Sequence, residues 1–96
     1  MKPSEALHSH REDICRVVEQ FHARNPRVFG SVLHGIDTEQ SDLDFLVDTT
    51  EATTLMDIAR IQGRLQKILG VSVDVLTPKA LPDSFRKRII SETRPV

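Results

Sequence analysis

Three aspartates in the sequence have the type and spacing that phosphate chemistry on a divalent cation requires. Asp42 and Asp44 stand two residues apart in a segment that alternates between polar and apolar residues. Side chains two apart on a strand share a face, so both carboxylates project from the same side of the predicted sheet. Asp74 occupies an outward position in a second alternating segment. Carboxylates this close repel one another, and an oxygen-binding cation such as Mg²⁺ would relieve the repulsion.

Gly30 and Ser31 supply a second chemical element. They follow a short β-branched and aromatic run at 27–29, where we expect a strand to give way to a short helix. A glycine at this point lets the backbone approach a ligand closely, and a helix start presents free N–H groups to an anion. A phosphate-binding turn beside three carboxylates makes up the parts needed for two-metal phosphoryl or nucleotidyl transfer.

Each of these features also has a simpler interpretation. A Gly-Ser pair is usually only a turn, and an Asp-x-Asp pair on a strand is usually a solvated face. Asp74 alone would be a charge on an edge strand. Asp48 shares the face of Asp44 but lies about 13 Å farther along, so we expect it to end the strand instead of joining the site. The combination and its order along the chain carry the prediction.

The predicted elements place these residues in a small sheet. Apolar residues at helical spacing predict helices over 4–23, from 53 or 54 to Gly70, and over 84–93. A short helix is expected over 31–34, and another turn of helix after Thr77-Pro78. Strands are predicted over 27–29, 42–48 and 71–76. This order predicts an α/β (α+β) fold, a small mixed sheet flanked by helices.

Length and composition bound the remaining possibilities. The 96 residues are expected to form a single domain over 1–96. Lys and Arg total 13 against 14 for Asp and Glu, which argues against direct binding of nucleic acid through a basic surface. The apolar runs are too short to cross a membrane, no signal peptide is visible, and a lone Cys15 makes no internal disulfide. We therefore expect a cytoplasmic protein.

Several other polar residues are expected on solvated surfaces, and Cys15 on the flank of the first helix. This group comprises His8, His10, His22, Arg60, Arg64, Arg86, Lys87 and Arg88. Phe85 and Ile89 are expected to anchor the last helix on the domain, unless that helix docks on a partner.

The combined pattern resembles the nucleotidyltransferase superfamily typified by DNA polymerase beta. It is more closely similar to the minimal nucleotidyltransferases that serve as antitoxins beside HEPN-type toxins. The resemblance rests on Phe29-Gly30-Ser31, Gly35, the Ser-Asp-Leu-Asp-Phe-Leu-Val-Asp run at 41–48 and Val-Asp-Val-Leu at 73–76. It covers nearly the whole chain. One departure is Leu33-His34, where the usual motif has Ala-Arg, so an imidazole replaces a guanidinium that could touch phosphate.

The resemblance implies a role for each site residue. Gly30 and Ser31 would hold the phosphates of a nucleoside triphosphate, with ATP as the expected donor. Asp42 and Asp44 would bind two Mg²⁺ ions, and Asp74 would complete the site of the ion that activates the acceptor. The acceptor would be a hydroxyl, a tyrosine in the expected case, on a cognate HEPN-type toxin that AMP attachment inactivates. Two alternatives stay open: an antitoxin that acts by binding alone, and a stand-alone transferase for a small molecule or an RNA end.

Overall fold

A four-stranded mixed sheet organises the protein, for which the computed structural model describes residues 2–96. The strands are β1 (Ala23–Phe29), β2 (Leu43–Thr49), β3 (Val73–Leu76) and β4 (Arg94–Pro95), in the spatial order β3-β2-β1-β4. β2 and β3 are parallel, whereas β1 is antiparallel to both β2 and β4. The predicted α/β (α+β) class with a small mixed sheet is confirmed.

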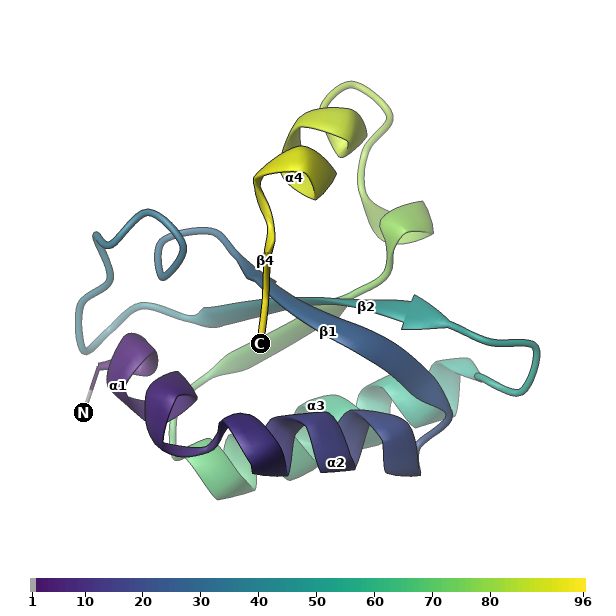
Figure 1. Cartoon of the computed structure of the whole chain (residues 1–96), viewed down its shortest axis with the longest axis horizontal. Coiled ribbons are helices and arrows are strands. Elements are labelled where there is room, and N and C mark those ends of the chain that lie inside the picture. Colours follow the sequence, from purple (N-terminus) through teal and green to yellow (C-terminus); the bar gives the residue numbers. More distant parts are fainter. Residues whose placement is uncertain (1) are drawn as a thin grey trace.

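Helices lie on both faces of this sheet (Figure 1). One face is covered by α1 (Pro3–Ser9), α2 (Arg11–Gln20) and α3 (Leu55–Leu69). The short 3-10 helix η1 (Pro78–Ala80) and α4 (Arg86–Glu92) lie over the opposite face. Among residues 2–96, no helix is long and apolar enough to span a membrane.

The main core lies between the sheet and the α2–α3 layer. Leu43, Phe45 and Val47 alternate along β2 and are each fully buried there. They pack with apolar residues of α2 and α3, among them Ile14 and Ile61. Each such side chain stabilises the fold by about 1.5–3 kcal/mol relative to exposure. The alternation read from the sequence therefore assigns the core face of β2 correctly.

The opposite face of β2 carries Asp44, Leu46 and Asp48, and it is partly covered as well. Leu46 is fully buried but does not belong to the main core cluster. The segment after β3 crosses this end of β2, and its Leu81 is only 4% exposed. The segment from Thr77 to Glu92 thus forms an arch over the face that bears the carboxylates (Figure 1).

The predicted helix over 4–23 is wrong in two respects. The chain breaks at His10 into α1 and α2, and it enters β1 already at Ala23. His22, two residues after α2, has a φ angle of 67°, which turns the backbone out of the helix, and Asn25 within β1 has a φ angle of 55°. A register shift between Arg24 and Arg27 lets proline sit inside β1, because a bulge frees the position from the ladder.

Helix α3 begins and ends as predicted. At its start, the Thr54 hydroxyl accepts from the Asp57 N–H, and the Asp57 carboxylate accepts from the Thr54 N–H. At its end, Gly70 adopts a left-handed conformation with a φ angle of 69°. Leu55, the first residue of α3, is apolar but 90% exposed.

The C-terminal segment differs most from the prediction. The last helix covers Arg86–Glu92 instead of 84–93, and β4 follows it unpredicted. Arg94 pairs with Val28, which returns the chain to the free edge of β1. Phe85 is 41% exposed and does not anchor the helix on the core; the buried apolar residue of this segment is Leu81.

Candidate active site

The three aspartates lie on the face of the sheet that the α4 arch covers. Asp44 and Asp74 are register partners on the parallel strands β2 and β3, and Asp42 directly precedes β2. Asp44 is half-buried, whereas Asp42 and Asp74 are exposed. The strand parity predicted from the sequence therefore brings Asp44 and Asp74 side by side, with Asp42 at the strand entrance.

The site carries negative charge that the protein does not neutralise. Burial, together with the neighbouring charges of Asp74 and Asp42, raises the pKa of Asp44 to about 6. In the described part of the chain, no ion pair within 4 Å joins any of the three to a basic side chain. Such a cluster favours an external cation.

These residues fit Mg²⁺ in donor type, shared face and uncompensated charge. Within residues 2–96, no three Asp, Glu, His or Cys side chains are already grouped as a complete metal site. Mg²⁺ does not require such a group, since it is usually held by one or two carboxylates together with water and substrate phosphates. Asp42, Asp44 and Asp74 are the side chains that would hold it here.

Gly30 brings backbone directly against this cluster. It follows the last residue of β1, Phe29, which is the register partner of Asp44. Its φ angle is 80°, a conformation that favours glycine. A Cβ atom at this position would clash with Asp44 Oδ2 and would lie 3.3 Å from Asp44 Cγ. Glycine is thus required both by the turn and by the space that Asp44 occupies.

The segment 30–35 is a series of turns, so the short helix predicted over 31–34 is wrong. His34 N–H donates to Gly30 O (3.3 Å), Gly35 N–H to Val32 O (3.2 Å) and Ile36 N–H to Ser31 O (3.1 Å). These bonds span different numbers of residues, and Gly35 at φ 70° ends the run before a helix forms. The N–H groups of Ser31 and Val32 donate no backbone hydrogen bond to another described residue, so an anion could accept from them.

Comparison with known proteins assigns the family. The family model for the nucleotidyltransferase domain matches residues 11–96. The chain belongs to the nucleotidyltransferase domain family. Protein adenylyltransferase MntA of Thermococcus cleftensis is 31% identical over 86 residues, covering 90% of this chain and 84% of the relative. The protein is therefore an enzyme of the nucleotidyltransferase type.

Solved structures agree with this assignment. A structure described as a candidate minimal nucleotidyltransferase is 38% identical, with a TM-score of 0.86 over 97% of this chain and 95% of that one. A crystal structure of a toxin–antitoxin with AMP-PNP superposes with a TM-score of 0.73 over 88% of this chain and 69% of that chain. At 15% identity, the second likeness concerns the fold alone.

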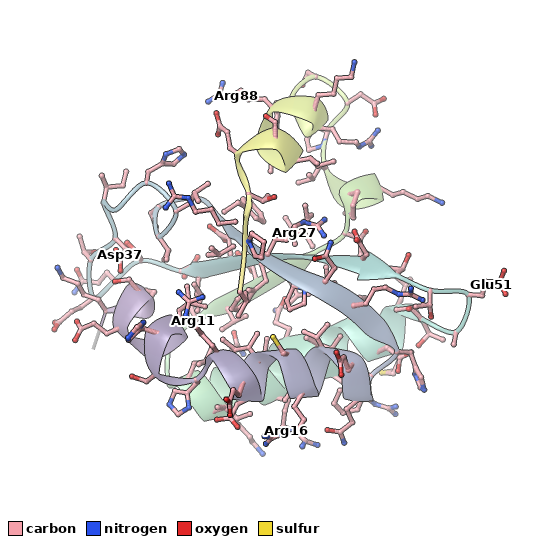
Figure 2. The ribbon with its side chains drawn as sticks, viewed as in Figure 1. Arg11, Arg16, Arg27, Asp37, Glu51 and Arg88 are labelled. Carbon is pink, nitrogen blue, oxygen red and sulfur yellow. The ribbon has the colours of Figure 1, made fainter. Side chains whose placement is uncertain are left out.

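Asp48 lies at the next-to-last position of β2, near the end of the strand where it was predicted. Its carboxylate accepts from Arg27 Nη2 and from Asn25 Nδ2, each at 3.0 Å. Arg27, and then Asn25, hold the pKa of Asp48 below its usual value. Figure 2 shows Arg27 on β1, the strand next to the one that carries Asp48. This carboxylate is satisfied within the protein, unlike those of the cluster.

A second carboxylate, Asp37, holds the loop of the nucleotidyltransferase between β1 and β2. It accepts from the Ser4 N–H at 3.0 Å, and this bond lowers the pKa of Asp37. Figure 2 shows Asp37 beside α1. The loop that connects the Gly30–Ser31 turn to Asp42 is therefore fastened to the N-terminal helix.

The polar side chains expected on the surface have mixed outcomes. His8, His22, Arg60, Arg64, Lys87 and Arg88 are exposed, whereas His10 and Arg86 are partly buried. Cys15 lies partly exposed on α2. His22 Nδ1 also lies 3.3 Å from Asp57 Oδ2, and Arg64 Cζ lies 5.6 Å from the centre of the Phe21 ring.

The sequence did not predict that Glu92 of α4 lies near the site, beside Arg88 and His34. Glu92 of α4 lies 3.7 Å from Arg88 Nε and 3.8 Å from His34 Nε2. The spacing of Arg88 and Glu92 is visible in the sequence, but nothing local indicates that this side of α4 faces the turn after β1. That position follows from β4, which returns the end of α4 to β1.

Proposed function

We propose that this nucleotidyltransferase transfers AMP from ATP to a hydroxyl group of a partner protein, a HEPN-type toxin that the transfer inactivates. The observation that carries the proposal is the half-buried Asp44, register partner of Asp74, with the glycine of the Gly30–Ser31 turn directly against it. The adenylyltransferase relative and the likeness in fold to a toxin–antitoxin structure support the donor and the kind of partner.

The residues divide the work according to their places in the fold. The backbone of Gly30 and Ser31, with the Ser31 hydroxyl, would bind the β- and γ-phosphates. Asp42 and Asp44 would hold Mg²⁺. When bound, Mg²⁺ neutralises phosphate charge and lowers the pKa of the acceptor hydroxyl.

Asp74 would act on the acceptor side of the site. It is exposed and lies on β3, the edge strand of the sheet, so a group arriving from solvent meets it before Asp44. The acceptor oxygen would attack the α-phosphorus in line, the bond to the bridging oxygen would break, and pyrophosphate would leave. Positioning and charge neutralisation supply most of the rate in such a transfer.

A protein acceptor agrees with the surface around the site. Ile36 is 70% exposed on the loop before Asp42, and Ile90 is 39% exposed on the arch. These apolar side chains would suit contact with another protein. The chain contains no tyrosine, so any AMP found on a tyrosine must belong to the partner.

Intact-protein mass spectrometry tests the proposal. The enzyme is incubated with Mg²⁺, ATP and the product of a neighbouring gene, and we expect the partner to gain the mass of AMP. Asp44→Asn should abolish the gain. Asp48→Asn is the matched control, because Asp48 shares the strand and face of Asp44 but pairs with Arg27. Neutralisation of the partner by Asp44→Asn without any adduct would favour an antitoxin that acts by binding alone.

A further inference from the structure

A pocket of about 460 Å³ lies between the turn after β1 and helix α4. Its apolar wall includes Phe29 of β1 together with Phe85 and Ile89 of the arch. Gly30 also lines it, and Gly30 is the residue whose backbone lies against Asp44. The pocket therefore adjoins the phosphate-binding turn, with no intervening segment between them.

Polar groups stand at the rim of this pocket. Arg88 and His34 both line it, and both contact the carboxylate of Glu92 at 3.7 and 3.8 Å. These contacts are long and solvent-exposed, so each holds its side chain only weakly. A ligand could exchange them for its own hydrogen bonds at little cost. The rim thus offers two donors and one acceptor around an apolar interior.

The pocket is held open by contacts at both ends of α4. At its start, Arg86 donates to Pro78 O at 2.7 Å and Leu81 O at 2.8 Å, and it pairs with Asp83 at 2.6 Å. At its end, Arg94 pairs with Val28 of the sheet. No residue of α4 itself is buried. The helix is fixed by its flanks, so its apolar side is left to line the pocket.

We propose that this pocket binds the base and ribose of the nucleoside triphosphate donor. The inference rests on the proposed function, since it takes the Gly30–Ser31 turn as the phosphate site. A ligand that spans both places must carry phosphates at one end and a flat, largely apolar ring at the other, which is the form of a nucleotide. The volume lies within the range of about 300–1,000 Å³ usual for small-molecule sites.

The side chains at the pocket have the chemistry that a base requires. The Phe85 ring, 41% exposed in the protein alone, provides a surface on which a base can stack. Arg88 and His34 can donate to ring nitrogens or ribose hydroxyls, and Glu92 can accept from an amino or hydroxyl group. A macromolecular acceptor is a poorer occupant, because its chain would have to enter between the turn and α4 to fill the pocket.

Equilibrium binding tests this assignment without any acceptor. Isothermal titration calorimetry compares Mg²⁺-ATP with inorganic tripolyphosphate, which has the phosphates but no nucleoside. We expect Phe85→Ala and Ile89→Ala to weaken ATP binding, Phe85→Ala about tenfold or more, while tripolyphosphate binds as before. Ile90→Ala is the matched control for Ile89→Ala, since the two isoleucines are neighbours on α4 and Ile90 does not line the pocket. It should leave both affinities unchanged.

Two results would overturn the inference. One is an equal loss of ATP and tripolyphosphate affinity, which would place the effect on the turn. The other is unchanged ATP binding with loss of partner binding, which would assign the pocket to the acceptor. Thermal unfolding checks that each variant folds, and Arg88→Ala at the exposed rim replaces any that does not. The proposed function can fail separately: base-dependent ATP binding without AMP transfer would refute the transfer and leave the pocket assigned.

Discussion

Replacing Asp44 by asparagine should make the protein more stable at neutral pH while it destroys the proposed activity. Asp44 has a pKa of about 6 in the folded protein against 3.8 for an ordinary aspartate, because of burial and the charges of Asp74 and Asp42. In the folded state the carboxylate is therefore less favourable than in the unfolded chain. An amide of the same shape avoids that cost.

The size of the effect follows from the pKa difference. A pKa difference of about 2 between the folded and unfolded states corresponds to about 3 kcal/mol in the free energy of unfolding, at about 1.4 kcal/mol for each pKa unit. Since Asp44 is only half-buried, solvent screening reduces the expected gain to about 1–1.5 kcal/mol. In a domain of this length, such a gain raises the melting temperature by about 4–12 °C.

The pH dependence has a definite sign. Below the unfolded pKa, Asp44 is protonated in both states and the two proteins should be equally stable. As pH rises from about 4 to about 6, the unfolded chain ionises before the folded one, so the wild type loses stability that Asp44→Asn keeps. Urea unfolding followed by circular dichroism, in EDTA and at about pH 3.5, 5 and 7, measures the difference.

Asp48→Asn provides the opposite control on the same strand. Arg27 and Asn25 lower the pKa of Asp48, so this carboxylate stabilises the fold when ionised. Its replacement should destabilise the protein at neutral pH, and the difference should shrink as the pH falls. If Asp44→Asn is no more stable than the wild type at pH 7, or if its advantage does not depend on pH, the electrostatic account of the site is wrong.

Four further substitutions probe how the fold holds the site. Gly30→Ala should cost about 2 kcal/mol or more in urea unfolding and weaken ATP binding, because φ is positive and the new Cβ meets Asp44; wild-type affinity for ATP would contradict this. Gln62→Leu and Gln66→Leu should each lower the free energy of unfolding by about 1 kcal/mol, because the two amide oxygens accept from N–H groups of the edge strand β3 at 3.1 and 3.2 Å. Both variants should also self-associate in size-exclusion chromatography, since these N–H groups lose their partners. A monomer of unchanged stability would show that the two glutamines do not protect the edge of β3. Arg86→Ala should speed hydrogen exchange across 86–92 and weaken ATP binding while the main core stays protected; unchanged exchange would show that other contacts hold α4.

The alternating strands were predictable because the signal is local. The period of two in 42–48 assigns Leu43, Phe45 and Val47 to the core, and it places Asp44 on the other face without any tertiary information. Asp74 follows by the same rule in 71–76. The caps of α3 also depend on neighbouring residues alone. Most of the carboxylate cluster could therefore be derived from the sequence.

The features that could not be predicted from the sequence depend on contacts between distant segments. β4 is two residues long and contains a proline, so only its pairing with β1 makes it a strand. Asn25-Pro26 reads as a break, and a bulge against β2 is what accommodates it. The pocket joins the turn at 30–34 to a helix more than fifty residues later, and no periodicity in either segment indicates the other.

The central claim is that this site transfers a nucleotidyl group to a partner protein, and the position of a label tests it most directly. ATP labelled at the α-phosphorus or at the γ-phosphorus is incubated with enzyme, Mg²⁺ and partner, and the proteins are separated on a denaturing gel. We predict that the partner acquires the α label only, and that Asp44→Asn transfers none. Label from the γ-phosphorus on the partner, or α label that persists in Asp44→Asn, would contradict the account.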